Sequence, residues 1–407
     1  MISNKTLLCF CLVFLISSSY ASLFHPSFLP KFPDLLKGIL PAQTNQPFPQ
    51  YVAALGYPVE THNITTSDGY INTYFRIQAK NSGSIKTGLP VVYLQHGLLD
   101  SSDTWIVNVE DQAPAFILAN KGFDVWVGNT RGNTYSLNAK QSNSSNASSA
   151  YWDFSWQEIS LYDLPAAFEY IFAATQKQIT YIGHSQGTSI MFAALCRHDP
   201  VVLKYLKHYI ALAPVVYVDN VGSPVVKLLG SGSLGKILQV LNKKEFLMLP
   251  HSVHESLALV CEFVNSACVA QLRLLSDTKP EFDNVDRMDV VLGHFPAGTS
   301  LQNMLYWNQM LVSKDFKMYD FGKDGNMKHY GTQTPPVYKL SDINVPVYLF
   351  AGKYDELAYP NSTATVRDQL TGSPKVFYQE YDLGHASFVW GKNVTGYFKD
   401  VLDIINA

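Results

Sequence analysis

Runs of β-branched and aromatic residues recur along this chain and predict buried strands. Residues 91–95 and 345–350 are almost wholly apolar, as in strands that are covered on both faces of a sheet. Further runs of the same residue types predict more strands. These runs are residues 71–77, 123–127, 178–182, 208–212 and 376–381.

Segments that favour helices separate these strands. Residues 114–121 stop at Gly122, a residue typical of helix ends. Asp163 can cap a helix that has Pro165 in its first turn and runs to about residue 174. Further helices are predicted at residues 188–196, 361–370 and 394–405. This alternation predicts an α/β fold with a mostly parallel sheet and helices on both faces.

An irregular segment, residues 215–335, interrupts the alternation and contains helical stretches at 225–241 and 254–275. An insertion before the last strands lies over the carboxyl edge of the sheet, where ligands bind. We therefore expect a core of residues 51–214 and 336–407, with the insertion 215–335 as a helical cap.

The first residues resemble a secretory signal peptide. Lys5 precedes the apolar run 7–16, and small residues favour cleavage after Ala21. The run is too short to span a bilayer, although an uncleaved anchor is an alternative. The signal is thus residues 1–21, and the proline-rich residues 22–50 are predicted to form an arm or a short pro-segment.

Cysteines and sequons fit an exported chain. Removal of the signal leaves Cys196, Cys261 and Cys268, so at most one disulfide can form. Cys261 and Cys268 are the candidate pair, and Cys196 is expected to be a buried free thiol. The sequons begin at Asn63, Asn143, Asn146, Asn361 and Asn393. Together they predict a glycoprotein.

Composition narrows the class of protein. The 407 residues are 47% hydrophobic and 15% charged, as expected for one large ordered domain with an insertion. A net charge of −3 gives no nucleic-acid footprint. The many aromatic residues suit an apolar ligand, but a large core explains most of them.

Gly183-His184-Ser185-Gln186-Gly187 lies between a predicted strand and a predicted helix. This is the nucleophile-elbow pattern of α/β-hydrolases, in which a sharp turn exposes the serine hydroxyl. A side chain at Gly183 or Gly187 would collide with the neighbouring strand or helix. The alternative is a tight turn in which Ser185 only caps the helix.

A nucleophilic serine needs a base and a group that orients the base, and this fold supplies them in the order Ser, Asp or Glu, His. Asp355 follows the strand ending at residue 350, and His385 follows the strand ending at residue 381. Both therefore fall at the same sheet edge as Ser185. Asp382 is the competing acid, but it is only three residues from His385 and is less well placed to reach the ring.

An oxyanion hole needs N–H donors held in place. Gln186, directly after the nucleophile, and Leu98, in the loop after residues 91–95, are the predicted donors. His96 and His184 flank the site. Each is a candidate second base, but a structural hydrogen-bonding role is favoured for both.

Over residues 45–400 the chain resembles the gastric and lysosomal acid lipase family. The resemblance lies in residues 94–99, 124–133, 162–166, 183–188 and 296–300. It implies that Ser185, Asp355 and His385 form a catalytic triad, that Leu98 and Gln186 form the oxyanion hole, and that the insertion is a cap and lid. It also implies hydrolysis of triacylglycerols or cholesteryl esters without a cofactor or metal.

Two features depart from that family. Ser387 stands where the family usually has an aspartate two residues after its histidine, so we expect one fewer carboxylate beside His385. With burial under a cap, this is expected to lower the pKa of His385 and permit work in acid. The spacing of Cys261 and Cys268 is also shorter than in the gastric enzyme.

The sequence therefore predicts an exported hydrolase of neutral lipid esters that acts at a lipid droplet, micelle or membrane surface. Residues 215–240 are expected to contribute a lid that opens there. The alternatives are an esterase for steryl, retinyl or shorter esters, a peptidase, and a lipid-binding or storage protein on a lipase fold. Storage would predict a broken triad, and none of its positions is missing.

Overall fold

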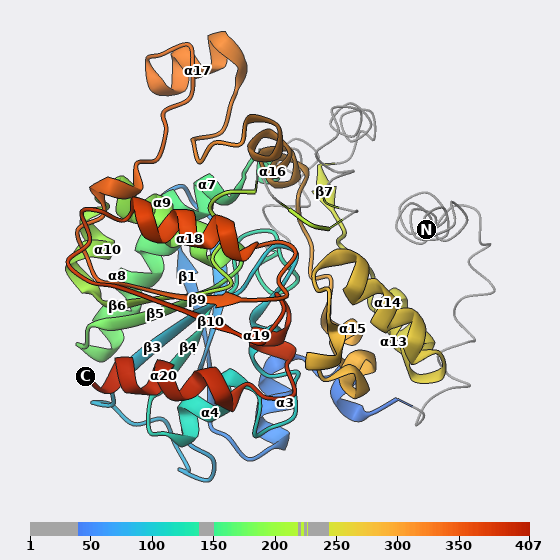
Figure 1. Cartoon of the computed structure of the whole chain (residues 1–407). Coiled ribbons are helices and arrows are strands. Elements are labelled where there is room, and N and C mark those ends of the chain that lie inside the picture. The colour runs from blue at the N-terminus through green and yellow to red at the C-terminus, as the bar shows by residue number, and fades with distance from the viewer. Residues whose placement is uncertain (1–39, 138–149, 219–220, 224–225, 227–243) are drawn as a thin grey trace.

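The computed structural model describes residues 40–137, 150–218, 221–223, 226 and 244–407. Its centre is an eight-stranded sheet with the order β1-β2-β4-β3-β5-β6-β9-β10 (Figure 1). The strands are β1 (Val59–Thr65), β2 (Ile71–Ile77), β3 (Val91–Gln95), β4 (Asp124–Val127), β5 (Ile179–His184), β6 (Leu206–Leu212), β9 (Val347–Gly352) and β10 (Val376–Tyr381). A small separate pair consists of β7 (Glu245–Phe246) and β8 (Thr299–Ser300).

The direction of the strands places several loops at one edge of the sheet. β1, β2 and β4 pair antiparallel, whereas all the other neighbours in the sheet are parallel. In this register Gln95 lies opposite Gly183, and His184 lies opposite Leu212. The carboxyl ends of β3, β5, β6, β9 and β10 therefore meet at one edge, where α/β sheets bind ligands.

Helices cover both faces, as the sequence predicted: α9 and α18 lie on one side of the sheet and α4 and α20 on the other (Figure 1). The helices are α3 (Phe48–Ala54), α4 (Pro114–Asn120), α7 (Trp156–Glu158), α8 (Leu164–Thr175), α9 (Gln186–Cys196), α10 (Pro200–Tyr205), α13 (His251–Phe263), α14 (Asn265–Leu275), α15 (Met288–His294), α16 (Leu301–Ser313), α17 (Gly322–Tyr330), α18 (Pro360–Gln369), α19 (Ser387–Trp390) and α20 (Thr395–Asn406). Short 3₁₀ or π turns are η3 (Ala42–Asn45), η4 (Ser102–Trp105), η5 (Ile159–Asp163), η6 (Pro280–Phe282), η7 (Val285–Arg287) and η8 (Leu340–Asp342).

The helix predicted at residues 254–275 is instead two helices, α13 and α14. The backbone leaves the helical region at Val264, with φ −136° and ψ 59°. A disulfide joins Cys261 to Cys268 across this break, so the candidate pair is bonded. Cys196 is a free thiol but only half-buried, less than expected, and burial raises its pKa to about 12.

The predicted N-terminal arm is partly core. α3 begins at Phe48, whose buried ring stacks on Phe75 with centroids 4.4 Å apart. The signal (1–21), residues 22–39 of the arm, Asn143, Asn146 and nearly all of the helical stretch 225–241 lie outside the described residues. Within the described residues, no helix is long and apolar enough to cross a membrane.

Asp163 does not cap α8, contrary to the prediction. It has helical backbone angles and gives its carboxylate to Arg131 instead. The Arg131 Nη2 lies 2.6 Å from Asp163 Oδ1, and its Nη1 lies 2.7 Å from Asp68 Oδ2. The side chains of Arg131 and Asp163 are 1% and 2% exposed, so the two charges depend on each other.

We predict that Arg131→Met lowers the free energy of unfolding by about 3–5 kcal/mol, because Asp163 is left as an unpaired buried charge. Urea unfolding followed by circular dichroism measures the loss. Lys80→Met is the matched control, since the Lys80–Glu110 pair is partly exposed and should contribute within about 1 kcal/mol. Equal small losses for the two variants would contradict the prediction.

Candidate active site

Ser185 occupies the turn between β5 and α9 with φ 55° and ψ −122°. This left-handed conformation is strained for a non-glycine residue and lifts the side chain out of the turn. The flanking glycines leave room for it. A Cβ on Gly183 would lie 2.7 Å from the Gly187 carbonyl oxygen, and a Cβ on Gly187 would lie 2.5 Å from the Gln95 carbonyl oxygen.

A hydrogen-bonded chain runs from Ser185 through His385 to Asp355. The Ser185 Oγ lies 2.8 Å from His385 Nε2, and His385 Nδ1 lies 2.9 Å from Asp355 Oδ2. The carboxylate of Asp355 is buried and also accepts the N–H groups of Leu357 and Ala358 at 2.8 and 2.7 Å. With a proton on Nδ1, His385 presents a free lone pair at Nε2 to the serine hydroxyl.

The loop after β3 lies against the serine. A Cβ on Gly97 would be only 3.0 Å from the Ser185 Cβ, so a side chain at this position would crowd the serine. Leu99 has φ 62°, and its carbonyl accepts the N–H of Ala297 at 2.6 Å. Leu98, between Gly97 and Leu99, is thereby held beside the turn that carries Ser185.

Gln186 begins α9, so its N–H is one of the first-turn groups that a helix leaves without an internal partner. Its side chain is fixed from α16. The Gln186 Oε1 accepts hydrogen bonds from Trp307 Nε1 at 2.8 Å and Asn303 Nδ2 at 3.0 Å. Residues far apart in sequence therefore fix the start of the helix next to the serine.

Comparison with known proteins places the chain in a family. Residues 90–392 match the family model "alpha/beta hydrolase fold", and residues 48–109 match "Partial alpha/beta-hydrolase lipase region". Rat gastric triacylglycerol lipase is 38% identical over 356 residues, which cover 86% of this chain and 88% of the relative. Human lysosomal acid lipase/cholesteryl ester hydrolase is 37% identical over 355 residues, with the same shares covered. The chain belongs to the gastric and lysosomal acid lipase family.

This membership confirms the resemblance and makes the chain a carboxylic ester hydrolase. A solved monoglyceride lipase from Saccharomyces cerevisiae, a soluble variant in complex with a substrate analogue, is similar in fold, with a TM-score of 0.54 at 14% identity. The similarity covers 88% of this chain and 98% of that one. It supports the α/β-hydrolase fold of the lipase.

The competing acid of the lipase points elsewhere. Asp382 pairs with Lys353 at 2.9 Å, and its side chain is 63% exposed. Asp355 is the carboxylate that contacts His385 Nδ1, at 2.9 and 3.1 Å through its two oxygens. The structure therefore places Asp355, and not Asp382, against the His385 ring.

His96 and His184 are neutral hydrogen-bonding residues. His96 Nδ1 donates to the Gly97 carbonyl at 2.8 Å, and its Nε2 accepts the Thr130 N–H at 3.2 Å. His184 Nε2 donates to the His385 carbonyl at 2.9 Å. Burial lowers the pKa of His96 to about 4 and that of His184 to about 3. Both rings thus hold the turns around Ser185, as favoured from the sequence.

The expectation that Ser387 leaves His385 without a second carboxylate nearby is wrong. Asp277 accepts the backbone N–H of His385 and that of Ala386, the latter at 3.2 Å. The Ser387 hydroxyl donates to Asp283 Oδ1 at 2.6 Å. Sequence reasoning missed both aspartates, because they lie in the irregular insertion about a hundred residues before His385 and follow no motif.

The expected fall in the pKa of His385 is also wrong. Burial lowers this pKa, but the carboxylates of Asp355 and Asp277 raise it, and the net pKa lies above the ordinary histidine value. Desolvation therefore does not dominate in the structure described. The favourable charges behind the ring stabilise the imidazolium.

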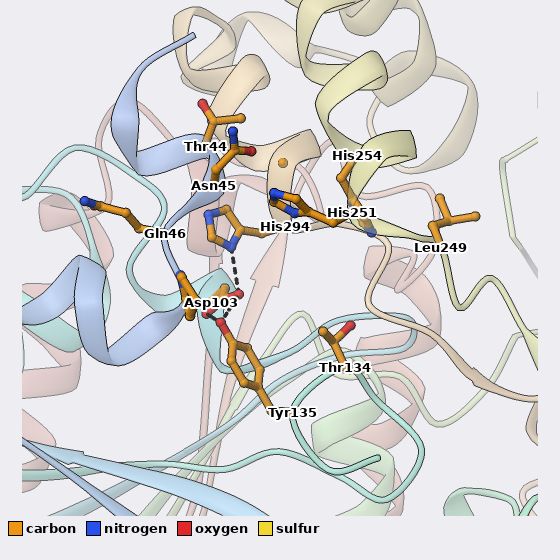
Figure 2. A pocket seen from close by; sticks show the side chains of 12 residues that line it. Thr44, Asn45, Gln46, Asp103, Thr134, Tyr135, Leu249, His251, His254 and His294 are labelled. Carbon is orange, nitrogen blue, oxygen red and sulfur yellow. Dashed lines mark hydrogen bonds and ion pairs between the residues drawn. The ribbon is translucent and has the colours of Figure 1, made fainter. Parts of the chain in front are cut away.

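A separate cavity of about 170 Å³ lies where the N-terminal segment meets α13 and α15 (Figure 2). His294 points to Asp103 with Nδ1 and Oδ2 2.8 Å apart, and Tyr135 also bonds Asp103. Burial lowers the pKa of His294, yet Asp103 raises it above its ordinary value. None of the residues lining this cavity belongs to the Ser185 site, and the described residues contain no cluster arranged to hold a metal ion.

Proposed function

We propose that this lipase is an exported serine hydrolase that cleaves neutral lipid esters through an acyl-enzyme on Ser185. The observation that carries the proposal is the continuous chain of contacts from Ser185 Oγ to His385 Nε2, at 2.8 Å, and from His385 Nδ1 to Asp355, at 2.9 Å. It fits the roles of nucleophile, base and orienting acid. No step of this reaction needs a cofactor.

The reaction follows from these positions. Ser185 Oγ attacks the ester carbonyl carbon and passes its proton to His385 Nε2, while Asp355 stabilises the imidazolium. The carbonyl oxygen becomes an oxyanion that accepts hydrogen bonds from the backbone N–H groups of Leu98 and Gln186. His385 then protonates the departing alcohol. Water, activated by the same histidine, attacks the acyl-enzyme and releases the fatty acid.

We assign residues 215–335 to a cap over this site, between core segments 51–214 and 336–407. Two contacts support the assignment: Trp307 of α16 bonds the Gln186 side chain at 2.8 Å, and Ala297 bonds the Leu99 carbonyl at 2.6 Å. The lid expected within residues 215–240 falls mostly outside the described residues.

The substrate class follows from the relatives, whose names specify triacylglycerols and cholesteryl esters. We propose one of these esters as substrate, presented by a lipid droplet, micelle or membrane surface. Export to the outside or to the lysosome is supported by the sequence of residues 1–21. Asn63, Asn361 and Asn393 are exposed, as glycan attachment requires.

Labelling and substrate profiling test the proposal together. A serine-reactive phosphonate should modify Ser185 at a ratio near one label per chain, and the label should block ester hydrolysis. The purified full chain is then assayed on glycerol esters of increasing acyl length, above and below their solubility limits. We expect the rate to rise when the longer esters form a separate phase.

The outcomes separate the candidate functions. Activity confined to dissolved short esters would support an esterase in place of a lipase. Lipid binding without any labelling or turnover would support a storage protein. A peptide labelled at a serine other than Ser185 would reject the assigned nucleophile.

A further inference from the structure

We propose that Asp277, a residue of the insertion, is a positioning residue that holds the His385 turn and places a second carboxylate behind the catalytic histidine. This inference rests on the proposed function, because it gives Asp277 a role only if His385 is the base. It concerns the environment of the base and adds no group to the list of residues that touch the substrate.

The first support is the contact with the histidine turn. The Asp277 side chain is fully buried, and its two oxygens accept the backbone N–H groups of His385 and Ala386. Hydrogen bonds to an ionised carboxylate are roughly twice as strong as neutral ones. Two successive N–H groups bound to one carboxylate fix the start of the turn that presents the His385 ring.

The second support is that the same segment also holds the turn of the acid. Asp277 forms an antiparallel bridge with Asp355. The Thr278 N–H donates to the Tyr354 carbonyl at 3.2 Å, and the Glu356 N–H donates to the Ser276 carbonyl at 3.0 Å. Residues 276–278 thus run beside the Asp355 turn while the Asp277 side chain reaches the His385 turn. One short strand of backbone sets the separation of base and acid.

The third support is a glycine shaped to this carboxylate. A Cβ on Gly384 would lie 2.0 Å from Asp277 Oδ1, far inside contact distance. Any side chain at this position would therefore push the carboxylate away from the His385 N–H. Gly384 precedes the histidine directly and leaves the space that Asp277 fills.

The groups around Asp277 determine whether its carboxyl group is ionised when His385 becomes protonated. Burial and the charge of Asp355 raise its pKa, while His385 and the backbone N–H groups of Ala386 and His385 lower it, and the resulting pKa is about 7. Burial, the charge of Asp277 and a hydrogen bond to the Asp277 side chain raise the pKa of Asp283 well above its usual range, despite the Ser387 hydroxyl, and so favour the neutral form of Asp283.

The other titratable neighbours do not compete with Asp277 as the charged partner of His385. His184 lies 5.0 Å from His385 between ring centroids and stays neutral, with a pKa lowered by burial to about 3. The charge of Lys392 lowers the pKa of Asp283. Asp277 and protonated His385 each favour the charged form of the other, because opposite charges attract in a buried site. Asp277 thereby stabilises the imidazolium that forms when Ser185 attacks.

The test compares Asp277→Asn with Asp283→Asn, two neutralising changes of equal size in neighbouring buried carboxyl groups. Enzyme concentration is set by phosphonate titration of Ser185, and kcat/KM is measured against pH on a soluble ester. The acidic limb reports the pKa of the base in the free enzyme. In Asp277→Asn we expect this limb to move to lower pH by about half a unit or more, because an ionised neighbour has been removed. Asp283→Asn replaces a neutral group and should leave the limb in place.

A limb in Asp277→Asn that coincides with that of the wild type would overturn the proposal, whatever the change in thermal stability. If Asp277→Asn does not fold, Gly384→Ala decides, since its added Cβ displaces the carboxylate without removing it and should move the limb in the same direction. An unmoved limb in Gly384→Ala would then reject the proposal. Failure of the phosphonate to label wild-type Ser185 would reject the proposed function instead.

Discussion

Replacing Ser185 by alanine is expected to lower kcat by about 10⁵–10⁶-fold, and His385→Ala is expected to cause a loss of the same order. In the proposed mechanism the hydroxyl supplies the attacking atom, and the imidazole, 2.8 Å away, accepts its proton. Without either partner, water can be activated only by the remaining groups of the site. Initial rates on a soluble ester, with circular dichroism to establish folding, measure the effect.

The double variant sharpens this prediction. Because the two residues act as one unit, Ser185→Ala with His385→Ala should be about as inactive as either single variant. Ser341→Ala, a change on the exposed core surface, should retain the wild-type rate. If the fold-loss of kcat in the double variant equalled the product of the two single losses, the serine and the histidine would act independently, contrary to the proposed mechanism.

The contact of Ser185, His385 and Asp355 was predictable because each residue closely follows a strand that is clearly marked in the sequence. β3, β5, β9 and β10 lie close to residues 91–95, 178–182, 345–350 and 376–381, where apolar runs placed them. Parallel strands bring their carboxyl ends to one edge of the sheet. Two residues 200 apart in sequence could therefore be predicted to lie close together. Local pattern and global fold agree here.

The groups around these three residues were not predictable in the same way. Asp277 lies in a segment without periodicity, and its partners are backbone N–H groups that no motif identifies. Asp163 has the residue type of a helix cap, but a buried arginine more than thirty residues away binds it instead. Such contacts depend on tertiary packing, which a local pattern does not encode.

The insertion shows the same limit for backbone structure. The apolar spacing over residues 254–275 fits one helix, yet the chain breaks at Val264 and a disulfide closes the two halves. α3 and β1 lie where proline and polar residues weaken the apolar periodicity of a helix and of a strand. Burial of Phe48 against Phe75 stabilises α3 there in place of a strong local pattern. Tertiary contacts therefore override local propensity at both places.

Asp355→Asn is expected to lower kcat by about 10³–10⁴-fold, less than Ser185→Ala, through the tautomer of His385. Asp355 Oδ1 accepts the Leu357 and Ala358 N–H groups at 2.8 and 2.7 Å. An asparagine keeps these bonds only with its carbonyl oxygen at that position, which turns its amide NH₂ toward His385 Nδ1. The ring must then accept at Nδ1 and carry its proton on Nε2, so it cannot take the serine proton.

Asp382→Asn is the matched control, because it removes an exposed carboxylate that pairs with Lys353 on the surface. Its kcat should stay within about twofold of the wild type, since an exposed ion pair contributes little and lies away from the ring. The loss in Asp355→Asn should appear in kcat on every ester tested, because it removes a transition-state interaction and no substrate contact. An active Asp355→Asn beside an inactive Asp382→Asn would transfer the role of the acid to Asp382. The buried hydrogen bonds that orient the Asp355 carboxylate argue for the opposite result.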